Sequence, residues 1–158
     1  MAMGTSARTT LTLTLTLTFA SFIATALGQG LTSCEYDADS CGCKTNKGLI
    51  SLKKYEDKGL TYVDTSSSAE YTWNPCKDVS IGLTDAACIQ AFPPILSYDC
   101  GTHDSTTSSV KSGYATFNLK ATVESRQSEI KCTCKSGEKF SFVKEDPPGY
   151  YYLEWTLK

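Results

Sequence analysis

Ala115-Thr116-Phe117-Asn118-Leu119-Lys120-Ala121 alternates apolar and polar side chains, and Lys139-Phe140-Ser141-Phe142-Val143 repeats the alternation further along the chain. A period of two residues is typical of a β-strand that buries one of its faces. Other stretches of strand length are rich in β-branched and aromatic residues and are bounded by Gly, Pro, Ser or Asp. Including the two alternating stretches, strands are expected around 48–54, 60–64, 70–74, 88–92, 114–122, 127–133, 139–143 and 150–156.

The breaks between these strands are expected at residues 64–68, 92–94, 104–112 and 146–149, where Pro, Gly, Ser, Thr and Asp gather. Helical periodicity is confined to one short turn near 84–89. Many short strands joined by loops and disulfides predict an all-β fold. We expect a flattened, disulfide-stapled β-barrel or sandwich of short antiparallel strands.

The first 28 residues have the features of a secretory signal peptide. Met1 to Thr10 carries one positive charge, Arg8, and no acidic residue, and the segment from Leu11 to Leu27 is uncharged. The Leu-Thr alternation within it also fits a strand, but its place at the N-terminus favours a signal. It is too rich in Thr for a membrane span of ~20 apolar residues, and no later segment qualifies. Residues 29–158 are therefore expected to form one domain that is secreted or lies in the lumen of the secretory or endolysosomal pathway.

All eight cysteines follow the predicted signal, at Cys34, Cys41, Cys43, Cys76, Cys88, Cys100, Cys132 and Cys134. In an oxidising compartment an even number of cysteines predicts disulfides, here up to four. Two close pairs are separated by a single residue, whereas zinc sites use two to four. The only histidine is His103. We therefore expect disulfides, no metal site and no cofactor.

The charge of the chain gives no support to a nucleic-acid partner. Its formal net charge is −2, and its lysines are scattered along the sequence. Proteins that bind nucleic acid or anionic membranes through electrostatics usually concentrate basic residues in one patch.

Four residues that lie far apart in the sequence, Gln90, Arg126, Glu145 and Tyr151, supply an amide, a guanidinium, a carboxylate and a phenol. Arg presents a rigid fork of donors, a carboxylate accepts hydroxyl protons, and an amide donates and accepts at once. Tyr adds a hydroxyl at the end of an apolar ring. The set is suited to vicinal sugar hydroxyls, so these four residues are expected to bind carbohydrate.

The motifs that contain these residues resemble those of the mannose 6-phosphate receptor homology domain. That family includes the lectin modules of lysosomal enzyme receptors and of several glycan readers of the endoplasmic reticulum. The resemblance covers about residues 34–158 and follows the family's order of motifs. These motifs are Gly48-Leu49-Ile50-Ser51-Leu52, Tyr71-Thr72-Trp73-Asn74-Pro75-Cys76, Ala86-Ala87-Cys88-Ile89-Gln90, Arg126-Gln127-Ser128-Glu129-Ile130 before Cys132, and Glu145 with Tyr151, Trp155 and Thr156.

The resemblance implies a flattened β-barrel of two packed sheets that recognises glycans without chemistry. It implies that Gln90, Arg126, Glu145 and Tyr151 contact the 2-, 3- and 4-hydroxyls of a terminal mannose. The implied partners are N-glycans or glycoproteins that bear mannose.

The sequence departs from the family's pattern in two respects. Gly149 stands where the family places a cysteine, so Cys132 and Cys134 are expected to pair differently, with Cys100 and each other's neighbours as alternatives. The acidic-Asn-His-Cys stretch that contacts phosphate in the receptors has no counterpart between residues 118 and 125, and His103 lies too far upstream. This departure favours neutral mannose over phosphomannose.

Two other classes of function compete with the lectin hypothesis. A disulfide-rich secreted interaction module with a degenerate, non-binding sugar site would use the rigid apolar loop Phe92-Pro93-Pro94-Ile95-Leu96 to bind a protein. An enzyme is disfavoured, because the sequence shows no Ser-His-Asp or Cys-His arrangement. Adjacent Glu145 and Asp146 would point apart rather than form a glycosidase pair. In purely structural roles, Tyr151 would be a core residue, Arg126 and Glu145 a surface ion pair, and Gln90 solvent-facing.

Overall fold

The computed structural model describes residues 30–123, 125–134 and 138–157, with the side chains of Cys134 and Leu157 excepted. The predicted signal peptide, residues 1–28, lies outside the described residues. The described part of the chain is nearly all β-structure, as the alternation predicts, and its strands form four sheets. Its only helices are three short 3-10 turns, η1 (Ala38–Ser40), η2 (Lys53–Tyr55) and η3 (His103–Ser105).

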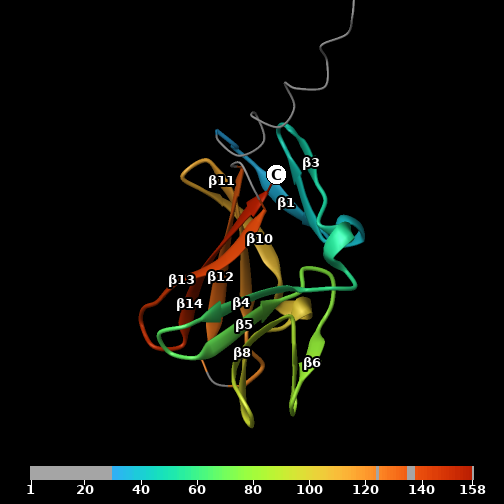
Figure 1. Cartoon of the computed structure of the whole chain (residues 1–158). Helices are drawn as coiled ribbons and strands as arrows, with labels where there is room; N and C mark the ends of the chain where they lie inside the picture. The colour runs from blue at the N-terminus through green and yellow to red at the C-terminus, as the bar shows by residue number, and fades with distance from the viewer. Residues whose placement is uncertain (1–29, 124, 135–137, 158) are drawn as a thin grey trace, which may run out of the picture.

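The largest sheet has five strands in the order β10-β11-β12-β14-β13 (Figure 1). Its strands are β10 (Thr107–Lys111), β11 (Tyr114–Lys120), β12 (Gln127–Cys134), β13 (Lys139–Glu145) and β14 (Tyr150–Leu157). β13 and β14 form a hairpin, and β14 also pairs with β12 in the parallel direction, with Ser128 opposite Tyr151. The expectation of antiparallel strands alone is therefore wrong for this pair. β14, the last strand along the chain, lies between β12 and β13. It is antiparallel to β13 and parallel to β12.

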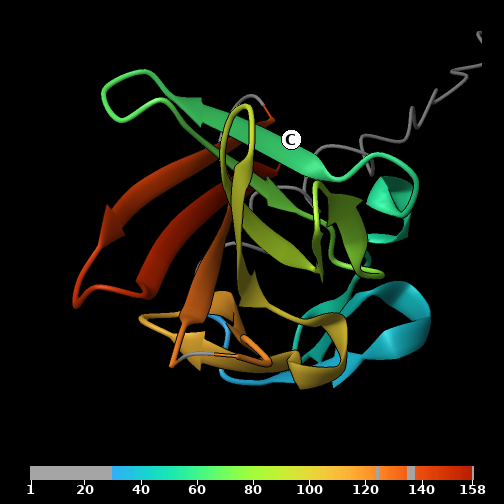
Figure 2. The same ribbon diagram turned by 90° about the horizontal axis from the view of Figure 1, so that it is seen from below.

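The second large sheet has four antiparallel strands in the order β4-β5-β8-β9. Its strands are β4 (Leu60–Asp64), β5 (Ala69–Trp73), β8 (Cys88–Phe92) and β9 (Leu96–Gly101). The small hairpin of β6 (Val79–Ile81) and β7 (Thr84–Ala86) forms a separate two-stranded sheet. Figure 2 shows the strands β4, β5 and β8 passing across one side of the five-stranded sheet.

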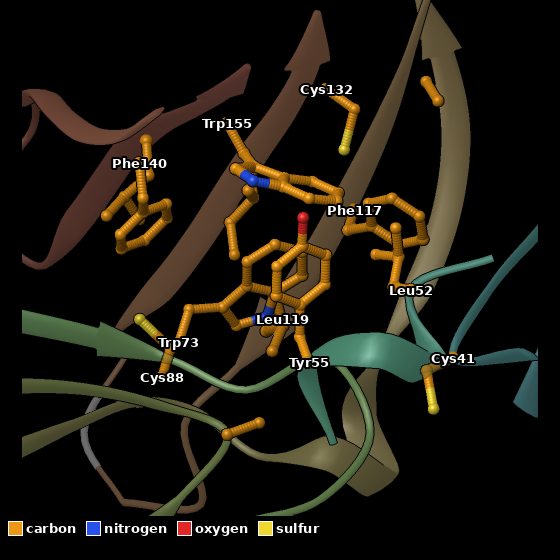
Figure 3. Packing of buried hydrophobic residues seen from close by; sticks show 14 of the residues in the cluster. Cys41, Leu52, Tyr55, Trp73, Cys88, Phe117, Leu119, Cys132, Phe140 and Trp155 are labelled. Carbon is orange, nitrogen blue, oxygen red and sulfur yellow. The ribbon is translucent and has the colours of Figure 1, made fainter. Parts of the chain in front are cut away.

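The core between these two large sheets contains a group of aromatic rings in mutual contact (Figure 3). Trp73 on β5 contacts Phe117 on β11, Phe140 on β13 and Trp155 on β14, with ring centroids 6.0–6.1 Å apart. Tyr55 packs edge-on against Trp155 at 4.8 Å. Each such contact adds about 0.5–1.5 kcal/mol to the gain from burying the rings. These contacts hold the two sheets face to face.

No described sheet closes into a barrel, because each sheet ends in two edge strands. The barrel half of the expectation is therefore wrong, and the packed sheets form a sandwich. The sheets approach each other closely at one corner, where the Thr102 amide donates to the Lys120 carbonyl at 3.0 Å. Gly101 lies at that corner with a φ of 153°, and a Cβ there would come within 2.3 Å of the Cβ of Leu119. Only glycine allows this approach without displacing Leu119.

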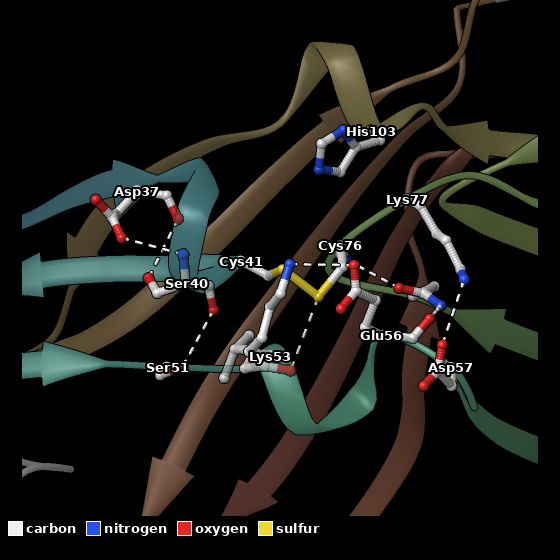
Figure 4. A network of polar contacts seen from close by, with 12 residues as sticks. Asp37, Ser40, Cys41, Ser51, Lys53, Glu56, Asp57, Cys76, Lys77 and His103 are labelled. Atoms are coloured by element: carbon white, nitrogen blue, oxygen red, sulfur yellow. Dashed lines mark hydrogen bonds and ion pairs between the residues drawn. A yellow bond between two sulfur atoms is a disulfide. The ribbon is translucent and has the colours of Figure 1, made fainter.

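A three-stranded N-terminal sheet of β1 (Cys34–Asp37), β2 (Gly42–Thr45) and β3 (Gly48–Ile50) sits beside the sandwich. One disulfide, Cys34–Cys43, lies within this sheet, and another, Cys41–Cys76, joins it to the chain after β5 (Figure 4). The hydroxyl of Tyr36 adds a hydrogen bond of 3.1 Å to Nε2 of His103. The N-terminal sheet is therefore fastened to the sandwich by a covalent bond and a polar contact.

The third disulfide, Cys88–Cys100, joins β8 to β9. Because Cys100 is bonded to Cys88, it is not the partner of Cys132 or Cys134. Cys132 is buried, and the side chain of Cys134 lies outside the described residues, so the involvement of these two cysteines in disulfides stays a prediction. Three disulfides are typical of proteins from oxidising compartments.

Two local predictions were wrong. The expected helical turn near 84–89 is strand β7 followed by the start of β8, because pairing with β6 and β5 overrides the weak helical pattern. The expected loop at 104–112 contains β10, which pairs with β11 through a tight turn. Ser112 and Gly113 both have positive φ angles, 51° and 77°, as the favoured two-residue hairpin turns require. Within the described ranges, no helix is long and apolar enough to cross a membrane.

Candidate functional site

Gln90 lies in the middle of a row of tyrosines on the four-stranded sheet. In the register of the strands it is opposite Tyr71 of β5 on one side and Tyr98 of β9 on the other, and Tyr62 of β4 is opposite Tyr71. Residues directly opposite each other in antiparallel strands point to the same face of the sheet. The row therefore presents three tyrosines and one amide toward the five-stranded sheet.

Tyr151 approaches the Gln90 amide from the five-stranded sheet. Its hydroxyl donates to Oε1 of Gln90 at 2.9 Å, and Nε2 of Gln90 donates to the hydroxyl of Tyr71 at 3.0 Å. All three side chains are buried. An amide has two N–H donors and two acceptor lone pairs, so one of each on Gln90 is not used by these two bonds. The two bonds fix the plane of the amide and leave it capable of further hydrogen bonding.

Glu145 ends β13 directly opposite Tyr151 of β14. Its side chain is exposed, and Oε1 accepts a hydrogen bond of 2.6 Å from the backbone amide of Gly149. Burial raises the pKa of Tyr71 above its usual 10.0, and the negative charge of Glu145 raises it further, against the opposing effect of the bond from Gln90. Because its pKa is raised, the Tyr71 hydroxyl stays protonated at neutral pH.

Arg126 lies immediately before β12 and reaches the same region. The Cζ atom of its guanidinium lies 3.9 Å from the centroid of the Tyr98 ring, a cation–π contact. Tyr98 is opposite Gln90, so the contact brings the guanidinium to the face of the sheet that carries the amide. Gly149 lies beside the base of the Arg126 side chain, since a Cβ built on it would be 3.4 Å from Cγ of Arg126.

We call this group of side chains the Gln90 cluster: Tyr71, Gln90, Tyr98, Arg126, Glu145 and Tyr151. Among the four residues expected from the sequence, Gln90 and Tyr151 are in direct contact. Arg126 reaches the cluster through its contact with Tyr98, and Glu145 lies opposite Tyr151 in the pairing of β13 with β14. Their role in binding carbohydrate stays a prediction.

Sequence reasoning did not identify Tyr71 and Tyr98 as members of the cluster. The signal for Tyr98 was the alternation of Leu96, Tyr98 and Cys100 after the Phe92-Pro93-Pro94 turn, which predicts a hairpin with Gln90 on the facing strand. The signal for Tyr71 was weaker, because its pairing with Gln90 depends on strands separated by the β6–β7 hairpin.

The Gln90 cluster is rich in groups that form hydrogen bonds. It offers a neutral amide, phenols, a cation and an anion, all of which form hydrogen bonds with neutral hydroxyl groups. His103 lies elsewhere, with its ring bonded to Tyr36 and its backbone amide donating to Asp78 at 2.7 Å. Within residues 30–123, 125–134 and 138–157, no group of three His, Cys, Asp or Glu side chains is arranged to hold a metal ion.

Comparison with known proteins gives no relative from which the function could be transferred: no family model matches the chain, and no curated protein matches it. The function is therefore inferred from the geometry of the Gln90 cluster.

Proposed function

We propose that this chain is a lectin-like domain of the secretory pathway that binds terminal mannose-type glycans at the Gln90 cluster and performs no chemistry on them. The observation that carries the proposal is the buried Gln90 amide, held between the Tyr151 and Tyr71 hydroxyls at 2.9 and 3.0 Å. A guanidinium and a carboxylate flank it, through Tyr98 and Tyr151 respectively.

The roles follow from what each group donates and accepts. Arg126 would donate two N–H bonds to a pair of adjacent hydroxyl oxygens, and Glu145 would accept hydroxyl protons. Gln90 would add one bond of each kind. A sugar whose hydroxyl points the wrong way would leave a buried polar group unpaired, which costs about 1–3 kcal/mol. The cluster would therefore discriminate among sugars by the stereochemistry of vicinal hydroxyls.

Neutral mannose suits the cluster better than phosphomannose. Arg126 is the only arginine after residue 8 of the sequence. It would have to serve the sugar hydroxyls and a phosphate at once, beside the negative charge of Glu145. The only histidine, His103, is bonded to Tyr36 on the N-terminal sheet.

The proposal is tested by titrating the oxidised protein with high-mannose and phosphomannosyl glycans, with Tyr151→Phe and Tyr152→Phe as a matched pair. The two tyrosines are neighbours on β14, but Tyr151 is 2% exposed and contacts Gln90, whereas Tyr152 lies on the opposite face over Lys144. We expect Tyr151→Phe to weaken binding and Tyr152→Phe to leave it unchanged. A folded wild-type protein that binds no mannoside would refute the proposal.

A second candidate function, binding of a protein partner, is supported by the apolar tips of two neighbouring hairpins. Leu83 between β6 and β7 is fully exposed, and Ile95 and Leu96 at the β8–β9 turn are 86% and 51% exposed. The two tips lie side by side, because the Ser97 hydroxyl donates to the Ile81 carbonyl at 3.1 Å. A Leu83→Ser, Ile95→Ser variant that loses a partner while keeping its mannoside affinity would assign protein binding to this surface.

A further inference from the structure

The Arg126 side chain has two close neighbours that sequence reasoning did not assign to the site. At the charged end, Cζ lies 3.9 Å from the ring centroid of Tyr98. Near the base of the side chain, the backbone of Gly149 lies close enough that a Cβ would be 3.4 Å from Cγ of Arg126. Tyr98 thus contacts the charged end of the side chain, and Gly149 lies beside its base.

Tyr98 is well placed to orient the guanidinium without competing for its donors. A cation–π contact uses the face of the ring and the charge of the guanidinium, and consumes no N–H···O hydrogen bond. Tyr98 is fixed in turn by an edge-on contact with Phe92, with ring centroids 6.2 Å apart, and by the β8–β9 ladder. The ring is therefore a supported surface for Arg126.

Gly149 links Arg126 to Glu145. Its backbone N–H donates to Oε1 of Glu145 at 2.6 Å, and its carbonyl accepts from the Gln127 amide at 2.8 Å. Gln127 is the residue directly after Arg126. One backbone unit thus fixes the carboxylate on one side and the start of β12 on the other.

We propose that Tyr98 is a positioning residue for Arg126 and that, with Gly149, it sets the angle at which the guanidinium meets the hydroxyls of the sugar. The inference rests on the proposed function. An arginine held in place before binding loses less side-chain entropy when it forms hydrogen bonds than one that moves freely. Replacing the aromatic face should therefore weaken binding although Tyr98 itself need not touch the sugar.

The first readout is independent of any ligand. The whole chain has two arginines, Arg8 and Arg126, so an arginine-labelled sample of the full chain gives at most two Nε–H signals, and Arg126→Lys identifies the one from Arg126. We expect that signal to be shifted upfield by the Tyr98 ring. The shift should persist in Tyr98→Phe and be lost in Tyr98→Leu. Tyr62→Leu, at the opposite end of the same row of the sheet from Tyr98, is the matched control and should keep the shift.

The second readout is mannoside affinity. Tyr98→Leu should weaken it about five- to tenfold, the order expected when a partly desolvated cation–π contact is lost, and Tyr98→Phe should restore it. A shift retained in Tyr98→Leu, or a lost shift with unchanged affinity, would overturn the positioning role while the lectin function stands. If the folded wild type binds no mannoside, the proposed function fails and this inference fails with it. Titration of the wild type alone shows this outcome, whereas failure of the positioning role alone shows only in the Tyr98 variants.

Discussion

The hydroxyl of Tyr151 donates a hydrogen bond of 2.9 Å to Oε1 of Gln90, and so joins two residues that are 61 positions apart and lie on different sheets. The bond is buried, and it is continued by the bond from Gln90 to Tyr71. A buried polar group without a partner costs far more than an ordinary hydrogen bond contributes. The two sheets therefore depend on each other at this point as well as in the aromatic core.

Tyr151→Phe should destabilise the domain by about 1–3 kcal/mol, because it leaves Oε1 of Gln90 buried without its donor. The free energy of unfolding is measured by urea denaturation monitored through Trp73 and Trp155. Tyr152→Phe, on the partly exposed face of the same strand, should change stability by less than about 0.5 kcal/mol. Equal effects of the two substitutions would contradict the importance of the Gln90 bond.

Gly149→Ala should both strain the backbone and place a methyl group against Cγ of Arg126. Gly149 has a φ of 83°, which costs a residue with a side chain about 1–2 kcal/mol. Gly48→Ala is the matched control, because Gly48 also has a positive φ, 120°, but a Cβ there meets nothing within 4 Å. Both substitutions should lower stability, and only Gly149→Ala should lower mannoside affinity. A loss of affinity in both would mean that strain alone disturbs the site.

Stability should fall at alkaline pH, in part because of Tyr71. Burial raises the pKa of Tyr71 above 10.0, so the folded protein keeps this proton to higher pH than the unfolded chain does. The contribution of Tyr71 to the stability of the folded state is fully present below about pH 10 and is lost as the pH rises through the pKa of Tyr71 in the folded protein. Tyr36 and Tyr150, whose pKa values burial also raises, act in the same direction. Urea denaturation at a series of pH values should show that the free energy of unfolding declines less steeply with pH for Tyr71→Phe than for the wild type. Identical slopes would mean that Tyr71 does not contribute to the loss of stability.

The disulfides should contribute unequally. Cys41–Cys76 closes a loop of 35 residues and Cys88–Cys100 a loop of 12. Chain entropy predicts losses of about 4 and 3 kcal/mol when each pair is replaced by serine. Urea denaturation of the two double variants checks the order, and a larger loss for Cys88–Cys100 would show that packing around β8 and β9 outweighs loop length.

The sequence predicted the strands best where the evidence for them was local. The alternation around Phe117 and Phe140 predicts β11 and β13, and the β-branched and aromatic residues at 88–92 predict β8, because these signals come from consecutive residues. β10 was missed because its Ser- and Thr-rich composition is that of a loop, and only pairing with β11 makes it a strand.

The site could be predicted only as a set of chemical groups. Gln90, Arg126, Glu145 and Tyr151 were recognisable by their chemistry and by a family resemblance, but nothing local places Tyr151 against Gln90. That contact depends on the register of the sheets and on the insertion of β14 between β12 and β13. Tyr71 and Tyr98 join the cluster for the same non-local reason, since each is brought opposite Gln90 by strand pairing.

The position of β14 also has a consequence for the order in which the protein assembles. β12 and β13 both pair with β14, so neither can complete its backbone hydrogen bonds until residues 150–157 have joined the sheet. The β13–β14 hairpin is local, but the β12–β14 contacts span the intervening strand and form more slowly, because that part of the chain must be ordered first. A nascent chain that has reached Gly149 therefore has two unsatisfied strand edges and an unfinished core without Trp155. We expect a chain that ends at Gly149 to lack the near-ultraviolet circular dichroism of the packed aromatic residues, whereas a native spectrum would show that the sheet forms without its central strand.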